Sequence, residues 1–272
     1  LSNLGLLKLD ELAIKSIPNG GFLAYLDFND VHFLDHQKTN QGIEKLAAEQ
    51  IPHPLSFSGW VGFFGYEFLG SHLGLNLSAN RDLQIPDGWF ARPRTIIHIL
   101  PGLTKIESCL PGRAQKIADS LNFSSEINLD TINFPTKYQR CNLEFPEYEK
   151  IFNQAREAIL DGESYQIKIS QRYEAGVRVN PLIAFDKLCL ANPAPEAFLL
   201  QTKSFSLVSC SPEIVIEKKN DILLTRPIGG TYERKKKEDT NSVIECFLND
   251  PKEVAEHNML VDLERNDLSS VC

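Results

Sequence analysis

Three segments determine what fold and chemistry this sequence can support: Ser-Pro-Glu at 211–213, Arg-Pro-Ile-Gly-Gly-Thr at 226–231, and Glu-His-Asn-Met-Leu-Val-Asp-Leu-Glu-Arg-Asn-Asp-Leu at 256–268. Glu213 lies between two apolar runs, which predicts a carboxyl group at a break between strands in largely buried surroundings. Burial would raise the pKa of this carboxyl group because it disfavours the charged form. The glycines at 229 and 230 let the backbone approach a ligand closely and direct its N–H groups at an anion.

The third segment lies on the best-formed helix of the sequence. Asp250 suits the N-cap, Pro251 suits the first helical position, and Glu253 would complete a capping box. Glu256 then shares a helix face with Leu260. A carboxylate on an inward face needs a cation, whereas one at the rim of an apolar stripe is simply solvated. The helix pattern by itself favours the solvated carboxylate.

Together these segments resemble the chorismate-binding enzymes, a family that includes anthranilate, aminodeoxychorismate, isochorismate and salicylate synthases. Within the family, component I (the large subunit) of anthranilate synthase is the most similar. Three further stretches share the family's order: residues 59–67, residues 163–172 and Asn-Pro-Ala-Pro at 192–195. Several motifs in the family's order are specific evidence for the resemblance, whereas any one motif alone would be weak evidence.

The resemblance implies a lyase of tryptophan biosynthesis that adds ammonia to chorismate and eliminates pyruvate, giving anthranilate. It also implies Mg²⁺ as cofactor, and a glutamine amidotransferase partner that supplies ammonia within a hetero-oligomer. Glu213 matches the family's general acid, Glu256 a metal ligand, and Gly230 and Thr231 a pair whose main chain contacts chorismate. Gln166 holds the position of the lysine that activates water in isochorismate and salicylate synthases, so ammonia addition is favoured.

Two alternatives to anthranilate synthase remain. Aminodeoxychorismate synthases often carry a lysine where this chain has Gly229, which disfavours that branch. A non-catalytic, truncated product is the other alternative, because the chain starts at Leu1, has its only methionine at 259 and ends at Cys272. These features suggest a fragment.

A tripeptide of possible regulatory importance follows the Asn-Pro-Ala motif. Pro195, Glu196 and Ala197 fall where feedback-sensitive members of the family contact tryptophan, often with a tyrosine in the tripeptide. Glu196 departs from that pattern and puts inhibition by tryptophan in doubt.

Composition narrows the choice of partners and compartment. A net charge of −8 over 272 residues argues against nucleic acid and against an anionic membrane surface. No apolar run approaches the length of a membrane span. Six scattered cysteines without a CxxC pair indicate neither a zinc ribbon nor a disulfide framework, so we expect reduced thiols in a cytoplasmic protein.

The order of predicted elements indicates an α+β fold with mixed, largely antiparallel sheets, because strand pairs and helices alternate without βαβ spacing. A polar connector at 122–136 divides the chain into an N-terminal subdomain, 1–140, and the first part of a chorismate-binding catalytic domain, 141–272. The predicted strands are 21–28, 31–34, 58–66, 94–100 and 165–173, with a hairpin turn at 218–221, and the predicted helices are 42–49, 113–121 and 146–161.

Overall fold

The computed structural model describes residues 2–18, 20–48, 54–75, 77, 80–122, 140–230 and 239–272. It confirms the predicted α+β class, with antiparallel pairing in every sheet of the described residues. Within those residues no helix has both the length and the apolar character needed to cross a membrane.

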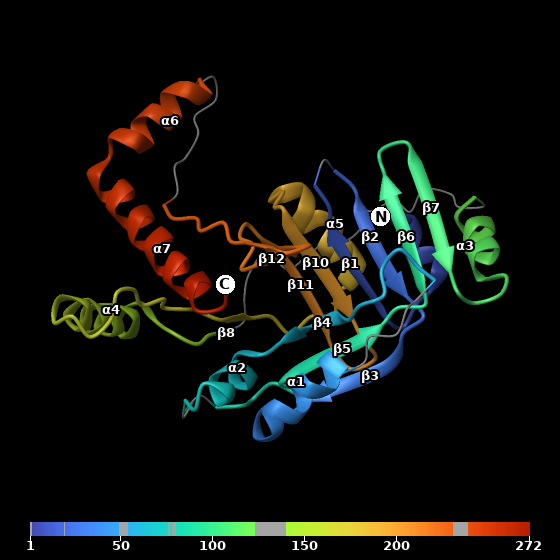
Figure 1. Cartoon of the computed structure of the whole chain (residues 1–272), viewed down its shortest axis with the longest axis horizontal. Helices are drawn as coiled ribbons and strands as arrows, with labels where there is room; N and C mark the ends of the chain where they lie inside the picture. Colours follow the sequence, from blue (N-terminus) through green and yellow to red (C-terminus); the bar gives the residue numbers. More distant parts are fainter. Residues whose placement is uncertain are drawn as a thin grey trace.

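A six-stranded antiparallel sheet forms the centre of the molecule (Figure 1). Successive side chains leave opposite faces, so Leu12 and Ile14 enter one core cluster while Ala13 enters another. Both faces of the sheet are therefore buried. In spatial order the strands are β11 (Ser206–Ser211), β10 (Glu196–Gln201), β1 (Leu12–Ser16), β2 (Phe22–Leu26), β6 (Thr95–Leu100) and β7 (Leu103–Ser108).

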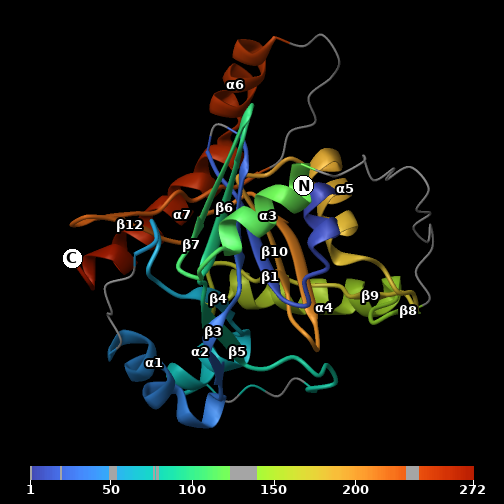
Figure 2. The same ribbon diagram turned by 90° about the vertical axis from the view of Figure 1, so that its right-hand side faces the viewer.

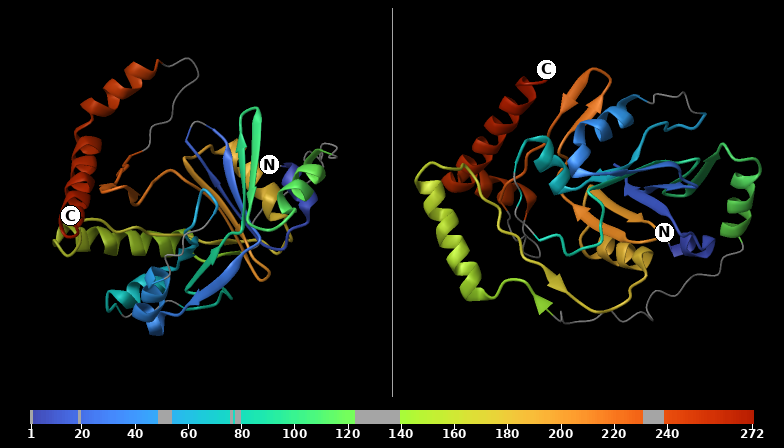
Figure 3. Two further views of the ribbon diagram at one scale, coloured as in Figure 1. Left: turned by 45° about the vertical axis from the view of Figure 1, so that its right-hand side comes forward. Right: turned by 90° about the horizontal axis from the view of Figure 1, so that it is seen from below.

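Helices cover one face of this sheet, as the right-hand view of Figure 3 shows. Phe185 and Ile117 are completely buried there against Ile97 of the sheet. The covering elements are the 3₁₀-helix η1 (Ser2–Leu7) and the helices α3 (Arg113–Asn122) and α5 (Pro181–Ala191). Asn180 caps α5 by accepting hydrogen bonds from the N–H groups of Leu182 and Ile183.

A three-stranded sheet packs on the other face, and the two sheets together are called the sandwich below. Trp89 and Ala91 meet Tyr25 and Ile96 between the sheets. The three-stranded sheet is flanked by α1 and α2 at the lower part of Figure 2. Its spatial order is β3 (Asn29–Leu34), β5 (Gly88–Arg92) and β4 (Val61–Phe64), and its flanking elements are η2 (His36–Lys38), α1 (Thr39–Ala48) and α2 (Tyr66–His72).

The glycine-punctuated strand expected at 58–66 is shorter than predicted, because β4 ends at Phe64 and α2 begins at Tyr66. The glycines of this segment allow close backbone packing as predicted. A Cβ at Gly62 would overlap the carbonyl oxygen of Trp89 on the neighbouring strand. Gly65 N–H donates to the Asp87 carbonyl at 2.6 Å, where a side chain would also clash. The segment therefore serves the core of the sandwich.

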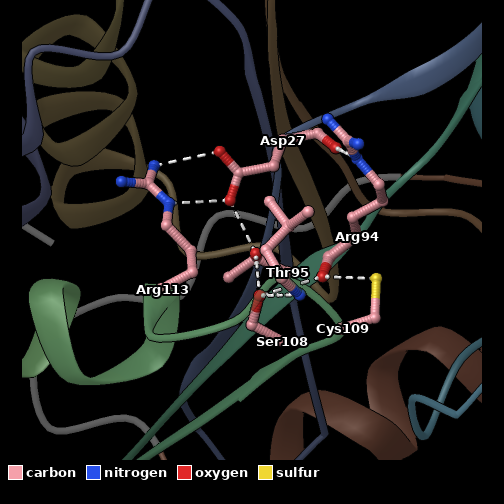
Figure 4. Close-up of polar contacts among 7 residues, drawn as sticks. Asp27, Arg94, Thr95, Ser108, Cys109 and Arg113 are labelled. Carbon is pink, nitrogen blue, oxygen red and sulfur yellow. Dashed lines mark hydrogen bonds and ion pairs between the residues drawn. The ribbon is translucent and has the colours of Figure 1, made fainter.

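Polar contacts around Asp27 tie α3 to the ends of β2 and β6 (Figure 4). Arg113 donates to both carboxylate oxygens of Asp27, at 2.9 and 3.0 Å. Thr95 donates to the same carboxylate at 2.6 Å and exchanges a hydrogen bond with Ser108. The two-point contact fixes the orientation of α3 relative to the sheet.

Beyond residue 140 the chain combines elements of the central sheet with elements outside it. β10 pairs with β1 on one side and with β11 on the other, so strands from both sides of the predicted boundary share one sheet. The boundary itself adjoins residues 123–139, which lie outside the described residues. The remaining elements are β8 (Arg140–Cys141), α4 (Phe145–Leu160), β9 (Tyr173–Glu174), β12 (Glu217–Lys219), β13 (Ile222–Leu224), α6 (Thr240–Asn249) and α7 (Pro251–Ser269).

The strand predicted over 165–173 is wrong except at its end. Among the described residues only Tyr173 of this stretch lies in a strand, where it pairs with Cys141 of β8. Arg172 N–H instead donates to the side-chain oxygen of Asn142 at 2.6 Å. The alternation of polar and apolar side chains is present, but a strand also requires a neighbouring chain for its backbone hydrogen bonds.

Candidate functional site

The Ser-Pro-Glu motif lies at the end of β11, where Ser211 holds the chain in a turn. The Ser211 hydroxyl donates to the Glu213 carbonyl at 3.2 Å and accepts from Glu213 N–H at 3.4 Å. Ile228 N–H then donates to Glu213 Oε1 at 3.4 Å. The β12–β13 hairpin thus returns the glycine-containing segment to the Ser-Pro-Glu motif.

The surroundings of Glu213 are less buried than predicted. The Glu213 residue is half-buried, and Val215 in the apolar run that follows is 82% exposed. This run leads into β12, which pairs only with β13 within the described residues. A two-stranded hairpin has no sheet behind it to bury its side chains.

The two glycines lie directly against α7, the helix with the third motif. A Cβ at Gly229 would lie 3.1 Å from Leu260 Cδ1 and 3.8 Å from Glu256 Oε1. Gly230 has a φ of +75°, and a Cβ there would overlap Glu253 Oε2. Only glycine suits position 230, because both its backbone conformation and the adjacent carboxylate exclude a side chain.

α7 begins as predicted, but Glu253 has a different partner from the one expected. Asp250 caps the helix by accepting from the N–H groups of Lys252 and Glu253, at 2.9 and 3.3 Å. Asp250 N–H donates to the Phe247 carbonyl of α6, so the reciprocal half of the capping box is not formed. The Glu253 side chain instead receives Lys252 Nζ on Oε1 at 3.1 Å.

Glu253 and Glu256 share this ammonium group. Lys252 Nζ is 4.0 Å from Glu256 Oε2, and hydrogen bonding and charge from Glu253, with the charge of Glu256, raise the pKa of Lys252. The side chains of Glu253 and Glu256 are 21% and 34% exposed. One ammonium group thus lies within 4.0 Å of both carboxylates.

The donor set on α7 fits a hard metal ion. Glu253 Oε2 is buried and has no hydrogen-bond partner among the described residues. Glu256 faces Gly229 rather than open solvent alone, which favours the inward carboxylate over the solvated one. Carboxylate oxygens are the ligands that Mg²⁺ prefers. The i, i+3 spacing of the two glutamates was the signal in the sequence that could have added Glu253 to Glu256.

Two predicted substrate-binding residues are not placed at this site. Gln166 is exposed on an irregular segment and, among the described residues, hydrogen-bonds to none of the three motifs. Thr231 lies outside the described residues.

Of the tripeptide Pro195-Glu196-Ala197, only Glu196 lines a separate cavity between the sheets of the sandwich. Ser16 donates to the Pro195 carbonyl at 2.6 Å and accepts from Ala197 N–H at 2.9 Å. Glu196 and Lys15 both line the cavity, which has a volume of about 390 Å³. Its aromatic lining consists of Tyr25, Phe57, Trp60, Phe63 and Phe198.

A second group of acidic residues, near η2, is already neutralised by the protein. Arg81 forms an ion pair with Asp87, and His36 contacts the other Asp87 oxygen at 2.6 Å. Burial alone would raise the pKa of Asp87, but hydrogen bonds from His36 and the charge of Arg81 lower it. Asp35 lies close to the same atoms. A guanidinium group within this cluster makes it a poor cation site.

Comparison with known proteins agrees with this arrangement of motifs. The profile of the family described as chorismate binding enzyme matches residues 21–272. The chain belongs to the chorismate-binding enzymes. As a member of this family it carries Ser-Pro-Glu, the double glycine and α7 inside the matched region.

The relatives of this chorismate-binding chain include several anthranilate synthase subunits. An anthranilate synthase component I-like protein of Synechocystis is 31% identical over 82% of the chain and 47% of its own length. The chloroplastic anthranilate synthase alpha subunit 2 of Arabidopsis thaliana is 30% identical over 85% of the chain and 41% of its own length. The crystal structure of anthranilate synthase component I from Streptococcus pneumoniae superposes with a TM-score of 0.64 at 25% identity, covering 94% of this chain and 59% of that one. The chain spans about half the length of the curated relatives it matches.

Proposed function

We propose that this chain is part of the large subunit of an anthranilate synthase, a lyase that converts chorismate and ammonia into anthranilate and pyruvate. One observation carries the proposal: Glu213, the double glycine and the carboxylates of α7 meet although they come from three separate segments. A proton donor, exposed backbone N–H groups and a metal-binding pair are what loss of a hydroxyl group from a dianionic substrate requires.

Glu213 would protonate the departing C4 hydroxyl group of chorismate. Ile228 N–H binds Glu213 Oε1, which leaves Oε2 as the oxygen that can carry the proton. Gly230 and Thr231 would offer main-chain contacts to a substrate carboxylate. Gln166 would leave water unactivated, because an amide cannot act as a base, so that ammonia is the nucleophile.

Glu256 and Glu253 would hold Mg²⁺ near the double glycine. When bound, the ion would neutralise the ring carboxylate of chorismate and favour departure of the hydroxyl group. Gly230 keeps the backbone close to Glu253, and Leu260 closes the apolar side of the site beside Gly229. Lys252 would have to release the two carboxylates, which its exposed position permits.

Gly229 supports anthranilate formation over aminodeoxychorismate formation. A lysine in the family's covalent branch needs room to reach the substrate ring. Here the direction of the Gly229 Cβ leads to Leu260 and the Glu256 carboxylate. An ammonium group at that position would pair with the metal ligand.

The test is the appearance of fluorescent anthranilate from chorismate, ammonia and Mg²⁺, for the 272-residue chain and for the longest natural polypeptide that contains it. Formation of aminodeoxychorismate instead would assign the chain to the alternative branch. If neither protein gives a product, the non-catalytic alternative holds.

Partner, compartment and domain division complete the proposal. A glutamine amidotransferase subunit would supply ammonia in a hetero-oligomer of tryptophan biosynthesis, in line with relatives named as components or alpha subunits. Six free cysteines agree with a reducing, cytoplasmic setting. We place the boundary between the N-terminal subdomain and the catalytic domain at residue 140. A pull-down from cells with tagged chain would identify the amidotransferase.

The cavity beside Pro195-Glu196-Ala197 supports a second site, for an amino-acid effector. Its aromatic walls suit an aromatic side chain, and the charges of Glu196 and Lys15 complement an ammonium and a carboxylate group. Tryptophan is the candidate from the family resemblance. Because Glu196 departs from the usual residue, we propose that it sets the affinity for the effector.

A further inference from the structure

Cys189 and Cys210 form a thiol pair that the proposed reaction does not use. Their sulfur atoms are 3.9 Å apart, one on α5 and the other on β11. Both side chains are half-buried and pack against the core cluster beneath α5. By contrast Cys109, Cys246 and Cys272 are exposed, and Cys141 contacts the Leu143 carbonyl at the base of α4.

We propose that Cys189 and Cys210 are an oxidisable dithiol whose disulfide joins α5 to β11. The sulfur atoms would have to approach by about 1.9 Å to reach the S–S bond length of about 2.0 Å. Such an approach needs side-chain rotation and a small shift of α5, since the helix packs directly on β11. Two half-buried thiols at this distance form a site that an oxidant can modify after a short movement.

A disulfide oxidant such as oxidised glutathione balances the reaction. One protein sulfur attacks the oxidant and releases one glutathione thiol. The other protein sulfur then displaces the second glutathione, so two protein thiols are oxidised while one disulfide is reduced to two thiols. Burial and the neighbouring Cys210 sulfur raise the pKa of Cys189, which lowers the fraction of the reactive thiolate at neutral pH.

The position of Cys210 links the thiol pair to the proposed catalytic site. This link rests on the proposed function. Cys210 directly precedes Ser211 and is three residues before Glu213, and in the sheet it pairs with Ala197 of the effector tripeptide. The disulfide would hold the end of β11, next to the Ser-Pro-Glu motif, against α5. Bond formation can be measured without any catalytic assay, so its failure and failure of the proposed function are separable.

The experiment uses the 272-residue chain with Cys109→Ser, Cys141→Ser, Cys246→Ser and Cys272→Ser, which leaves only the pair. Equilibration in a buffer of oxidised and reduced glutathione, followed by acid quenching and peptide mass spectrometry, gives the effective concentration of the two thiols. The same measurement in concentrated urea is the reference. Matched controls add Cys189→Ser or Cys210→Ser and can form only glutathione adducts.

We expect the effective concentration to be about a hundredfold higher in the folded chain than in urea, the ratio that corresponds to a stabilising disulfide across a loop of this size. The proposal is overturned if the effective concentration in the folded chain is no higher than in urea. It is also overturned if only glutathione adducts form and no cross-linked peptide appears. If circular dichroism shows that the serine variant is unfolded, the wild-type chain is used after alkylation of its exposed thiols. The same two outcomes then decide.

Discussion

The sandwich and the outer helices α4, α6 and α7 are held in opposite ways. The sandwich buries three clusters of apolar side chains, including Trp89 and Phe68. Within the described part of the chain, none of the residues of the outer helices is buried, and Leu248 of α6 is 71% exposed. Figure 1 shows these helices extending away from the central sheet. Apolar packing thus stabilises the sandwich. The proposed catalytic site depends instead on a few polar contacts and on close backbone contacts with α7.

The largest expected effect is a difference in amide hydrogen exchange between the sandwich and the outer helices. Backbone amides of β1, β2 and β6 should exchange on the order of a thousandfold more slowly than those of α4 and α6, because only the strands need global unfolding to open. Peptide-level exchange of the 272-residue chain measures both regions in one sample. Equal protection would show that the outer helices are stabilised as strongly as the sandwich.

Glu213→Gln should lower anthranilate formation by about a hundredfold or more in the active polypeptide, because it removes the proton donor with little change of shape. The Ile228 N–H can still donate to the amide oxygen, so the fold should be kept. Steady-state turnover with ammonia as the nitrogen source is the measurement. Glu149→Gln, at an exposed position of α4, is the matched control and should leave turnover unchanged. Activity near that of the wild type would remove Glu213 from the mechanism.

Gly229→Lys should lower turnover by about tenfold, because its ammonium group would pair with Glu256 and compete with Mg²⁺. The loss should shrink as the concentration of Mg²⁺ rises. Gly229→Ala tests crowding against Leu260 alone and should show no such dependence on Mg²⁺. Faster release of anthranilate by the lysine variant would contradict both the branch assignment and the position of the metal ligand.

Glu196→Gln should weaken binding of an aromatic amino acid to the sandwich by roughly threefold to tenfold, since it removes one charge-assisted hydrogen bond at a partly open cavity. Isothermal titration calorimetry with tryptophan and with phenylalanine measures the affinity. Glu11→Gln, whose half-buried side chain does not line the cavity, is the control. Unchanged affinity would show that Glu196 does not contact the effector.

Acid should weaken the sandwich slightly through Glu107. Hydrogen bonds from Lys105 and from Ser56 N–H lower the pKa of Glu107 to about 2. A depressed pKa stabilises the fold above the ordinary value of about 4.3, and this contribution is lost as the pH falls towards about 2. The urea midpoint should therefore fall by about a few tenths of a molar between about pH 5 and pH 3.

Tryptophan fluorescence reports this acid effect for the sandwich alone, because Trp60 and Trp89 are the two tryptophans of the chain and contribute to its core clusters. Glu107→Gln should show a flatter pH dependence. An identical slope in the variant would assign the acid sensitivity to other carboxylates, of which Asp87 is the first to test.

The sequence by itself determined the features that depend on neighbouring residues. Asp250 and Pro251 start α7 as predicted, because a cap is formed within three residues. The hairpin turn at 218–221 forms where expected, with Asn220 at a positive φ of 54°. The order of the motifs indicated the family, which the matched region confirms.

Tertiary structure alone decided the features that depend on distant residues. The contact of Ile228 with Glu213, the placement of Gly230 on Glu253 and the approach of Cys189 to Cys210 each join separate elements. The periodic pattern at 165–173 could not show that a pairing strand is missing from the described residues. Caps and turns follow from short-range geometry, whereas pairing and burial depend on which remote segment occupies the adjacent space.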